Sequence, residues 1–345
     1  MKQRKAALVI SLDFELYWGI RDLRDLNSCR ARLLNARPAI SRLLDLFCQF
    51  DIHATWATVG FLFFRNRREL LAALPSAQPN YHSRVLSPYR AVLSIGETEE
   101  DDPFHFAPSM IQDILDTPHQ ELGTHTFSHY YCLEDGQTQT SFREDLEAAV
   151  HATANWGVTL RSLVFPRNQV NAAYLPACAE CGIQAYRGAG SHWMYRERKR
   201  SSESSVRRAV RLLDAYLNIS GHNTFSLDCT GQGPPFNLPA SRYLRPYSPH
   251  LRLLEPLRLA RICRGLDYAA AKNRVYHLWF HPEDFGPNLN QNLRCLEMIL
   301  RHYVALRDRG AMESVSMGEL ADRLRHSSHE ISGQQELCEQ AHAES

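Results

Sequence analysis

Two histidines, His125 and His129, give the strongest chemical signal in this sequence. Imidazoles at this spacing can bind a single metal ion, and the hydroxyl residues between them, Thr126 and Ser128, can orient the second ring nitrogens. The spacing is also compatible with two histidines that face solvent or are satisfied by local hydrogen bonds. The short apolar approach at residues 120–123 predicts that the pair follows a strand, where α/β folds place catalytic groups.

Two acidic side chains follow a strongly apolar segment near the amino terminus. Residues 6–12, Ala-Ala-Leu-Val-Ile-Ser-Leu, predict a buried strand that leads directly into Asp13, Phe14 and Glu15. Side chains two residues apart in an extended chain lie on the same face, so both carboxylates can reach one cleft. One of them can bind a cation while the other accepts a proton.

Two further apolar segments end in polar residues. Residues 162–165 lead into Pro166 and Arg167, and residues 275–280 lead into His281. Four predicted strands therefore each deliver a polar cluster at their end. This pattern is typical of a (β/α) barrel, whose active groups gather at one end of the strands.

Together these segments resemble the polysaccharide deacetylase family, carbohydrate esterase family 4, which includes chitooligosaccharide and peptidoglycan deacetylases. The resemblance extends from about residue 6 to about residue 325. Its most specific part is the segment from His125 to His129, which is similar to the family's metal-binding His-[Ser/Thr]-x-x-His motif. Residues 54–60 resemble the family's second strand, and the segment ending at His281 resembles its last motif. The resemblance implies a distorted (β/α) barrel of about seven parallel strands with long loop insertions.

The resemblance also implies a role for each site residue. Asp13 would be the catalytic base, and Glu15 would bind one divalent metal ion, expected to be Zn²⁺, together with His125 and His129. The two acids could exchange these roles. His281 would be the general acid, beside an apolar pocket that accepts the acetyl methyl group.

Two motifs depart from the family pattern. Phe14 follows Asp13 where the family usually has two adjacent aspartates. The family commonly places an arginine two residues before the proline of its third motif, whereas here Arg167 follows Pro166. The usual arginine support for the base is therefore missing from this motif, and the backbone N–H of Arg167 becomes a candidate oxyanion donor.

The expected activity is hydrolysis of carbon–nitrogen bonds other than peptide bonds. Metal-activated water would remove N-acetyl or O-acetyl groups from a sugar or glycan precursor, with Asp13 as base and His281 as acid. Two alternatives stay open on the same fold: a hydrolase of cyclic imides or ureides, and a non-catalytic carbohydrate-binding protein. A nucleic-acid reader that uses the basic residues at 196–211 is disfavoured, because the formal net charge is only +1 and no reader motif is present.

Composition is typical of a soluble enzyme. A chain of 345 residues with 44% hydrophobic content can bury a large single core. No apolar run approaches the ~18 residues of a membrane-spanning helix, and the basic residues 1–5 lead into a strand, not into a signal sequence. Nine cysteines, an odd number, suit reduced thiols and hence a cytoplasmic location. That location favours a nucleotide-linked or lipid-linked sugar as the substrate.

We expect one domain at residues 1–326, followed by a disordered tail at 327–345. Insertions are expected at about 75–108 and about 186–250, and the second carries Trp193 and a group of arginines that could bind phosphate or carboxylate. Expected helices include residues 31–50, which Pro38 could split, residues 142–156, introduced by Ser141, and residues 290–309. A strand at 314–316 and a helix at 318–324 are expected to close the barrel.

Overall fold

The computed structural model describes residues 5–190, 192–199, 203–227, 230 and 233–326. The expected tail at 327–345 lies outside these residues. The strands pair in the order β6-β5-β4-β3-β2-β1-β8-β7, with β9 also beside β1, and every pair is parallel. Their bounds are β1 Ala6–Phe14, β2 Ala54–Thr58, β3 Gln120–Thr124, β4 Ser162–Val164, β5 Ala185–Arg187, β6 Phe236–Asn237, β7 Arg242–Tyr243, β8 Val275–Phe280 and β9 Met312–Ser314.

One extended segment, residues 236–244, joins the two edges of this sheet. It contains β6, which pairs with β5, and β7, which pairs with β8. Its backbone N–H groups donate to carbonyl oxygens on both sides: Leu238 to Tyr186, Ala240 to Gly188, Ser241 to His277 and Leu244 to Trp279. The sheet therefore closes into a barrel with seven strand positions, which confirms the predicted α/β barrel.

The alternation of side chains in β1 shows how the barrel is built. All nine residues of this strand are buried. Leu8, Ile10 and Leu12 belong to the large core cluster beneath the helices, whereas Ala7 and Val9 belong to a smaller cluster that joins residues of several strands to the helix at 317–326. Asp13 continues the inward-facing register of Ala7 and Val9. The period of two therefore places its carboxylate at the end of the barrel interior.

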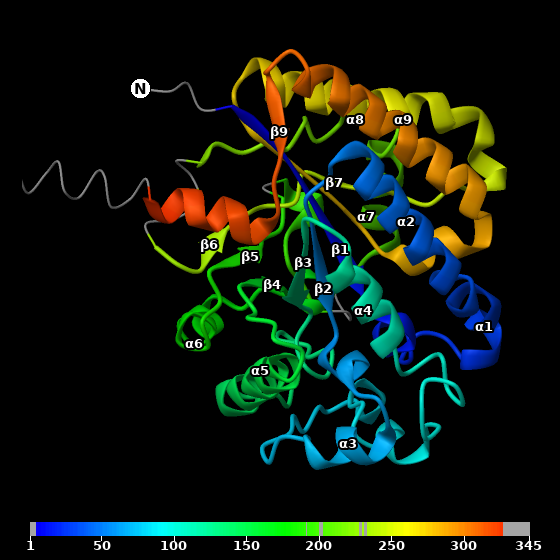
Figure 1. The fold of residues 1–345 in the computed structure, drawn as a ribbon, viewed down its shortest axis with the longest axis vertical. Coiled ribbons are helices and arrows are strands. Elements are labelled where there is room, and N and C mark those ends of the chain that lie inside the picture. The colour runs from blue at the N-terminus through cyan, green and yellow to red at the C-terminus, as the bar shows by residue number, and fades with distance from the viewer. Residues whose placement is uncertain (1–4, 191, 200–202, 228–229, 231–232, 327–345) are drawn as a thin grey trace, which may run out of the picture.

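Helices cover the outside of the strands (Figure 1). Their bounds are α1 Leu26–Leu34, α2 Ala36–Phe50, α3 Arg67–Ala72, α4 Pro108–Asp116, α5 Gln139–Ala154, α6 Leu175–Glu180, α7 Ser205–Asp214, α8 Glu255–Ala271 and α9 Leu289–Arg307, followed by a helix at 317–326. Within the described ranges, no helix has both the length and the apolar composition that a membrane crossing requires.

Two details of the expected helices are corrected. The break in the first helical region lies at Asn35, and Pro38 lies in the first turn of α2, where its missing N–H costs no hydrogen bond. The cap of α5 is Thr138, whose side chain accepts from the N–H of Ser141 while the Ser141 hydroxyl accepts from the N–H of Thr138. Ser141 is therefore the third residue of the helix and not its cap.

The regions expected as insertions differ in what they contribute. Residues 75–108 hold only short 3-10 turns, at Arg84–Leu86 and Ala91–Ser94. The region at about 186–250 includes the end of β5, helix α7 and both strands that close the barrel. Closure thus comes from this region, whereas β9, a strand expected to close the barrel, pairs with β1 at Ala6–Leu8.

Candidate active site

A cavity of about 240 Å³ lies at the carboxyl ends of the strands. All six predicted site residues line it: Asp13, Glu15, His125, His129, Arg167 and His281. Asp13 is part of β1, and the other five lie on the segments that follow β1, β3, β4 and β8. Parallel strands expose their carboxyl ends at the same end of a barrel, and this is why segments far apart in the sequence meet here.

Glu15, His125 and His129 form a compact group of metal-ligand side chains. One carboxylate oxygen of Glu15 lies 3.3 Å from Nε2 of His125 and 3.0 Å from Nε2 of His129. The ligand atoms of all three residues lie within 4.8 Å of one another, and all three side chains are buried. Burial lowers the pKa of His129 to about 4, against the opposing effect of Glu15, so this imidazole is neutral near pH 7.

The second ring nitrogens of the two histidines do not follow the expectation, and they differ from each other. Nδ1 of His125 donates to the backbone carbonyl of Val164 at 2.8 Å, which leaves Nε2 free to face Glu15. Within the described residues, Nδ1 of His129 has no hydrogen-bond partner, and the Ser128 hydroxyl donates to Asp145 instead of contacting a ring nitrogen. Thr126 instead accepts from the N–H of Tyr130. The tautomer of His125 is thus fixed by a backbone carbonyl of the neighbouring strand β4 and not by a hydroxyl of the motif.

Asp145 of α5 holds the loop that carries the two histidines. Its buried carboxyl accepts from the N–H of Phe127 at 2.8 Å, from the hydroxyl of Ser128, and from the hydroxyl of Tyr89 at 3.2 Å. Burial raises the pKa of Asp145 to about 6, against the opposing effect of these hydrogen bonds. Thr126 and His129 have φ angles of 62° and 59°, so the loop needs this fixed anchor to stay in the left-handed region.

Arg187, at the end of β5, supplies the support for Asp13 that the third motif lacks. Its two terminal nitrogens lie 2.6 and 2.7 Å from the two oxygens of Asp13, and the guanidinium is fully buried. It also donates to Ser11 and Asn168, each at 3.0 Å. Burial alone would raise the pKa of Asp13, but Arg187 and the nearby histidines lower it. The sequence analysis missed Arg187, although an arginine that ends an apolar strand before Gly188 was a usable signal.

His281 lies between the two acidic residues of the first motif. Its Nε2 is 3.8 Å from Asp13 and 3.6 Å from Glu15, and its Nδ1 is 3.4 Å from Asp284. Burial favours the neutral ring, but the carboxylates of Glu15, Asp284 and Asp13 raise the pKa of His281 to about 10. Asp284 is itself held by Arg32 at 2.5 Å. The imidazole is 23% exposed, so a substrate can reach it.

The turn after β1 is built to aim Glu15. The buried carboxyl of Glu283 accepts from the backbone N–H groups of Glu15 and Leu16, at 3.0 and 2.6 Å. Leu16 has a φ of 46°, so this turn uses a left-handed residue that Glu283 holds in place. A Cβ on Gly19 would lie 1.9 Å from the Glu15 carboxyl carbon, so only glycine leaves room for the carboxylate. Neither Glu283 nor Gly19 was predicted as a site residue.

Arg167 lines the cavity, but its side chain is engaged. The guanidinium pairs with buried Asp22 at 2.5 and 2.7 Å and lies 4.4 Å above the ring of Tyr131. Arg167 and Asn168 have consecutive left-handed φ angles of 55° and 53°. Such backbone is costly for residues other than glycine, and it is found most often at functional sites.

A second group of possible metal ligands lies at the opposite end of the barrel. Asp51, His53 and His119 precede β2 and β3, and they are exposed or half-buried. The two imidazole rings stack with centroids 4.1 Å apart and an interplanar angle of 3°. Parallel rings direct their nitrogen lone pairs side by side, so they converge poorly on one ion. Nδ1 of His53 is also held by Glu319 at 2.8 Å.

Solved structures share this fold at low sequence identity. A protein designated a polysaccharide deacetylase from Mycobacterium smegmatis has a TM-score of 0.58 and 14% identity, over 95% of this chain and 93% of its own. A protein designated a polysaccharide deacetylase from Pseudomonas aeruginosa PAO1 has a TM-score of 0.54 and 11% identity, over 94% and 91%. Puue allantoinase has a TM-score of 0.54 and 11% identity, over 95% and 93%.

No protein-family profile matches the sequence, and no curated protein matches it. The similarity to solved structures nevertheless shows that the chain has a polysaccharide deacetylase-like fold. The same fold is found in an allantoinase, so the reaction has to be argued from the site.

Proposed function

We propose that the protein is a metal-dependent hydrolase that removes acetyl groups from the nitrogen, or the oxygen, of a sugar or glycan precursor. One observation carries the proposal: Glu15, His125 and His129 surround one point, and Asp13 and His281 lie beside it. A metal-ligand group, an ionised carboxylate and an imidazole are the parts that hydrolysis of an amide requires. We also place the reaction in the cytoplasm, on a nucleotide-linked or lipid-linked sugar.

The residues present fit a divalent ion such as Zn²⁺. Two ligand atoms at about 2.1 Å from a tetrahedral zinc ion are separated by about 3.4 Å. The distances from the Glu15 oxygen to the two Nε2 atoms, 3.0 and 3.3 Å, are close to this value. A divalent ion bound there would polarise the acetyl carbonyl and lower the pKa of a water molecule.

Asp13 is suited to accept the proton of the attacking water. Arg187 keeps its carboxylate ionised, and the bidentate pair fixes both oxygens with respect to the barrel. The same pair makes Asp13 a weak base, so the water must already be acidified when the proton moves. Asp13 then serves chiefly to orient the water and to hold its proton.

His281 is suited to donate a proton to the leaving amine. Three carboxylates near the ring favour its charged form, and Nδ1 faces Asp284 at 3.4 Å while Nε2 faces Asp13 and Glu15. Cleavage of the C–N bond returns the electron pair to nitrogen, and the proton from Nε2 converts it into a neutral amine. The products are acetate and the free amino sugar.

The backbone N–H of Arg167 is our candidate for stabilising the negative oxygen that develops on the carbonyl. The side chain is held by Asp22, so a substrate meets the backbone of this residue instead of its guanidinium. A single oxyanion donor is worth about 3–4 kcal/mol in the transition state.

Acetate release and metal content test the function together. Purified protein loaded with zinc should release acetate from N-acetylated sugars, and His125→Ala should reduce both zinc content and acetate release. His53→Ala is the matched control, because it removes a histidine from the exposed group at the other end of the barrel. Full activity of metal-free protein, or loss of the ion only in His53→Ala, would contradict the proposal.

The same assay separates the alternatives. A hydrolase of ureides would consume a ureide such as allantoin without releasing acetate from any N-acetylated sugar. A carbohydrate-binding relative would bind sugars and release nothing.

A further inference from the structure

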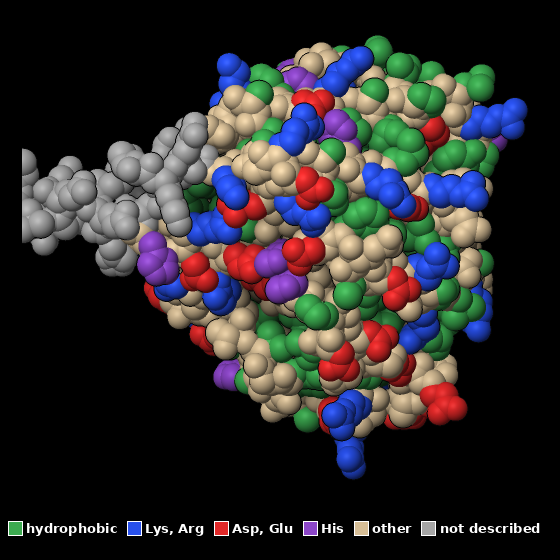
Figure 2. Space-filling view, turned by 45° about the horizontal axis from the view of Figure 1, so that its top comes forward, with side chains coloured by type: hydrophobic (Ala, Val, Ile, Leu, Met, Phe, Trp, Pro, Cys, Tyr) green, Lys and Arg blue, Asp and Glu red, His purple; other side chains and the backbone are tan. Residues whose placement is uncertain are grey.

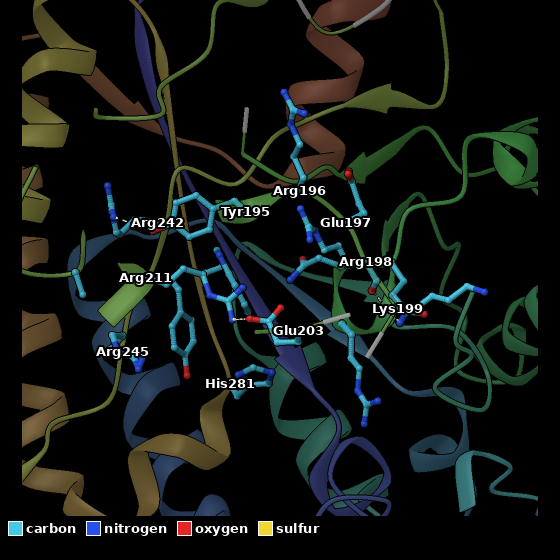
Figure 3. Close-up of a pocket in the computed structure, with 16 residues that line it drawn as sticks. Tyr195, Arg196, Glu197, Arg198, Lys199, Glu203, Arg211, Arg242, Arg245 and His281 are labelled. Carbon is cyan, nitrogen blue, oxygen red and sulfur yellow. Dashed lines mark hydrogen bonds and ion pairs between the residues drawn. The ribbon is translucent and has the colours of Figure 1, made fainter. Parts of the chain in front are cut away.

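A second cavity, of about 470 Å³, opens beside the proposed active site. The two cavities share Arg167, Asn168, Trp279 and His281. Figure 3 shows this cavity, with His281 at one end and side chains from the region 195–245 around it. A substrate whose amide reaches His281 therefore extends into this space.

The lining of the cavity is strongly basic. Of the described residues that form it, seven are arginine or lysine and two are glutamate. Three of the cations have acidic partners outside the cavity: Arg167 with Asp22, Lys199 with Asp135, and Arg242 with Asp214. Arg211 pairs with Glu203 across the lining at 2.6 Å. This accounts for four of the seven cations.

The remaining three, Arg196, Arg198 and Arg245, form no ion pair within the described residues, and Glu197 is the one acid left among the lining residues. Arg196 and Arg198 are exposed, whereas Arg245 is half-buried. Partial dehydration of a guanidinium that has no counter-ion costs free energy, as it does for half-buried Arg245. An anion bound in the cavity would offset this cost.

Arg245 and the proposed general acid His281 line the same cavity. Arg245 follows Tyr243 by two residues, and the ring centroid of Tyr243 lies 6.0 Å from that of His281 and 4.6 Å from that of Trp279. The phenol donates to Asp284, which holds His281. Arg245 therefore lies on the chain segment that carries this tyrosine, in the cavity that His281 also lines.

The surplus of positive charge is local. The formal net charge of the chain is only +1. On the face drawn in Figure 2, basic and acidic side chains lie next to one another instead of gathering by sign. A concentration of unpaired arginine in one cavity thus requires an explanation that the composition does not give.

We propose that the substrate carries an anionic group, a phosphate or a carboxylate, that binds in this cavity, where Arg245 and Arg198 supply positive charge from opposite sides (Figure 3). This inference rests on the proposed function and narrows its substrate to acylated sugars with an acidic substituent. Guanidinium groups match the geometry of both anions through paired N–H donors.

The test compares binding and acetate release for three probes on the zinc-loaded protein. N-Acetylglucosamine 1-phosphate carries a phosphate, N-acetylmuramic acid carries a carboxylate, and N-acetylglucosamine is neutral. We expect at least one anionic probe to bind about tenfold more tightly than the neutral sugar, with an advantage that falls as salt is added. The probe with the larger advantage identifies the anion.

Variants locate the anion. Arg245→Gln, and independently Arg198→Gln, should remove most of the advantage while leaving the affinity for the neutral sugar unchanged. Arg264→Gln, an exposed arginine of α8 outside the cavity, is the matched control and should change nothing.

Two results would overturn the inference. One is that the three probes bind equally, or that none of them binds. The other is that the advantage survives both cavity variants, as it would if the anion bound only to the metal. If neutral and anionic probes release acetate equally, the anionic-substrate inference is rejected and the proposed deacetylase function stands. If binding depends on Arg245 but no acetate is released, the proposed deacetylase function is rejected.

Discussion

Asp13 and Glu15, two residues with proposed chemical roles, are each held by a charged partner from a distant part of the chain. Asp13 is fixed by Arg187, and Glu15 by the carboxyl of Glu283 beneath its backbone. The partner of His281 is local, because Asp284, three residues further along the chain, lies 3.4 Å from its Nδ1. These partners set the orientation and the charge of the groups that react, so the roles can be separated by single substitutions.

Asp13 and Glu15 should fail in different ways when they are neutralised. Asp13→Asn should leave zinc content nearly unchanged and lower turnover by about 10²–10⁴, as expected for the loss of a general base. Glu15→Gln should first weaken zinc retention, because it removes a charged ligand. Metal analysis and acetate release on the same preparations measure both effects. Loss of zinc in Asp13→Asn alone would show that the two acids have exchanged roles.

The acid role of His281 can be measured with two kinds of leaving group. His281→Ala should remove most of the turnover of an N-acetyl substrate, because the amine needs a proton to leave. An activated acetate ester, whose leaving group needs no proton, should lose much less. His302→Ala, on the partly exposed surface of α9, is the control. Equal losses for amide and ester, with zinc content unchanged, would assign His281 to binding or structure.

At the scale of elements, the loop that carries the proposed metal ligands His125 and His129 packs closely against the segment that follows β2. The N–H of Gly60 donates to the carbonyl of Thr126 at 2.9 Å, and the N–H of Phe61 donates to the carbonyl of Phe127 at 3.0 Å. A Cβ on Gly60 would lie 2.6 Å from the ring of Phe127 and 2.8 Å from its Cα. The absence of a side chain at this position allows the loop to present its histidines.

Gly60→Ala should therefore displace the loop between His125 and His129. We expect zinc affinity to fall about 10–100-fold, as for other losses of support around metal ligands, and stability to fall by about 1–3 kcal/mol from overpacking. Zinc titration and thermal unfolding measure the two effects. Gly233→Ala is the control, because a Cβ there meets open space. Unchanged zinc affinity in Gly60→Ala would show that the loop does not depend on this contact.

At the scale of the whole molecule, a buried ion pair ties the region of residues 186–250 to the barrel. Asp214 at the end of α7 pairs with Arg242 of β7, and it also accepts from the hydroxyls of Tyr195 and Ser220. Asp214 and Arg242 are both buried. The pair therefore fixes the helix that carries Arg211 to the segment that closes the barrel.

Asp214→Asn should destabilise the protein by about 3 kcal/mol, because it leaves a buried guanidinium without its counter-ion. Thermal unfolding measures this loss, and Asp267→Asn on the exposed side of α8 is the control. A melting temperature equal to that of the wild type would mean that the pair does not anchor the region.

The same pair predicts a pH dependence. Burial alone would raise the pKa of Asp214, but Arg242 and the hydrogen bonds from Tyr195 and Ser220 lower it well below its usual value. A carboxyl group with a lowered pKa stabilises the fold above the unfolded-state pKa of about 4, and this stabilisation is lost as the pH falls below that value. The wild type should thus lose more stability than Asp214→Asn between pH about 4 and about 2.

Local patterns in the sequence were sufficient to predict the strands that lead to the six site residues, but they did not reveal β5, β6 or β7. The alternation in β1, the histidine spacing at His125 and His129 and the apolar run before His281 are set within a few residues each. Because parallel strands share one catalytic end, these patterns were enough to bring all six predicted residues to one cavity.

Only the tertiary structure decided which residues support and surround them. Arg187 reaches Asp13 across 174 residues, and Glu283 reaches the backbone of Glu15 across 268. Residues 236–244 close the barrel by pairing with β5 and β8, two strands that are far apart in the sequence. Such contacts arise from the order of strands and the packing of loops around them, and no local periodicity encodes either. The cavity that places Arg245 near His281 is likewise visible only in the tertiary structure.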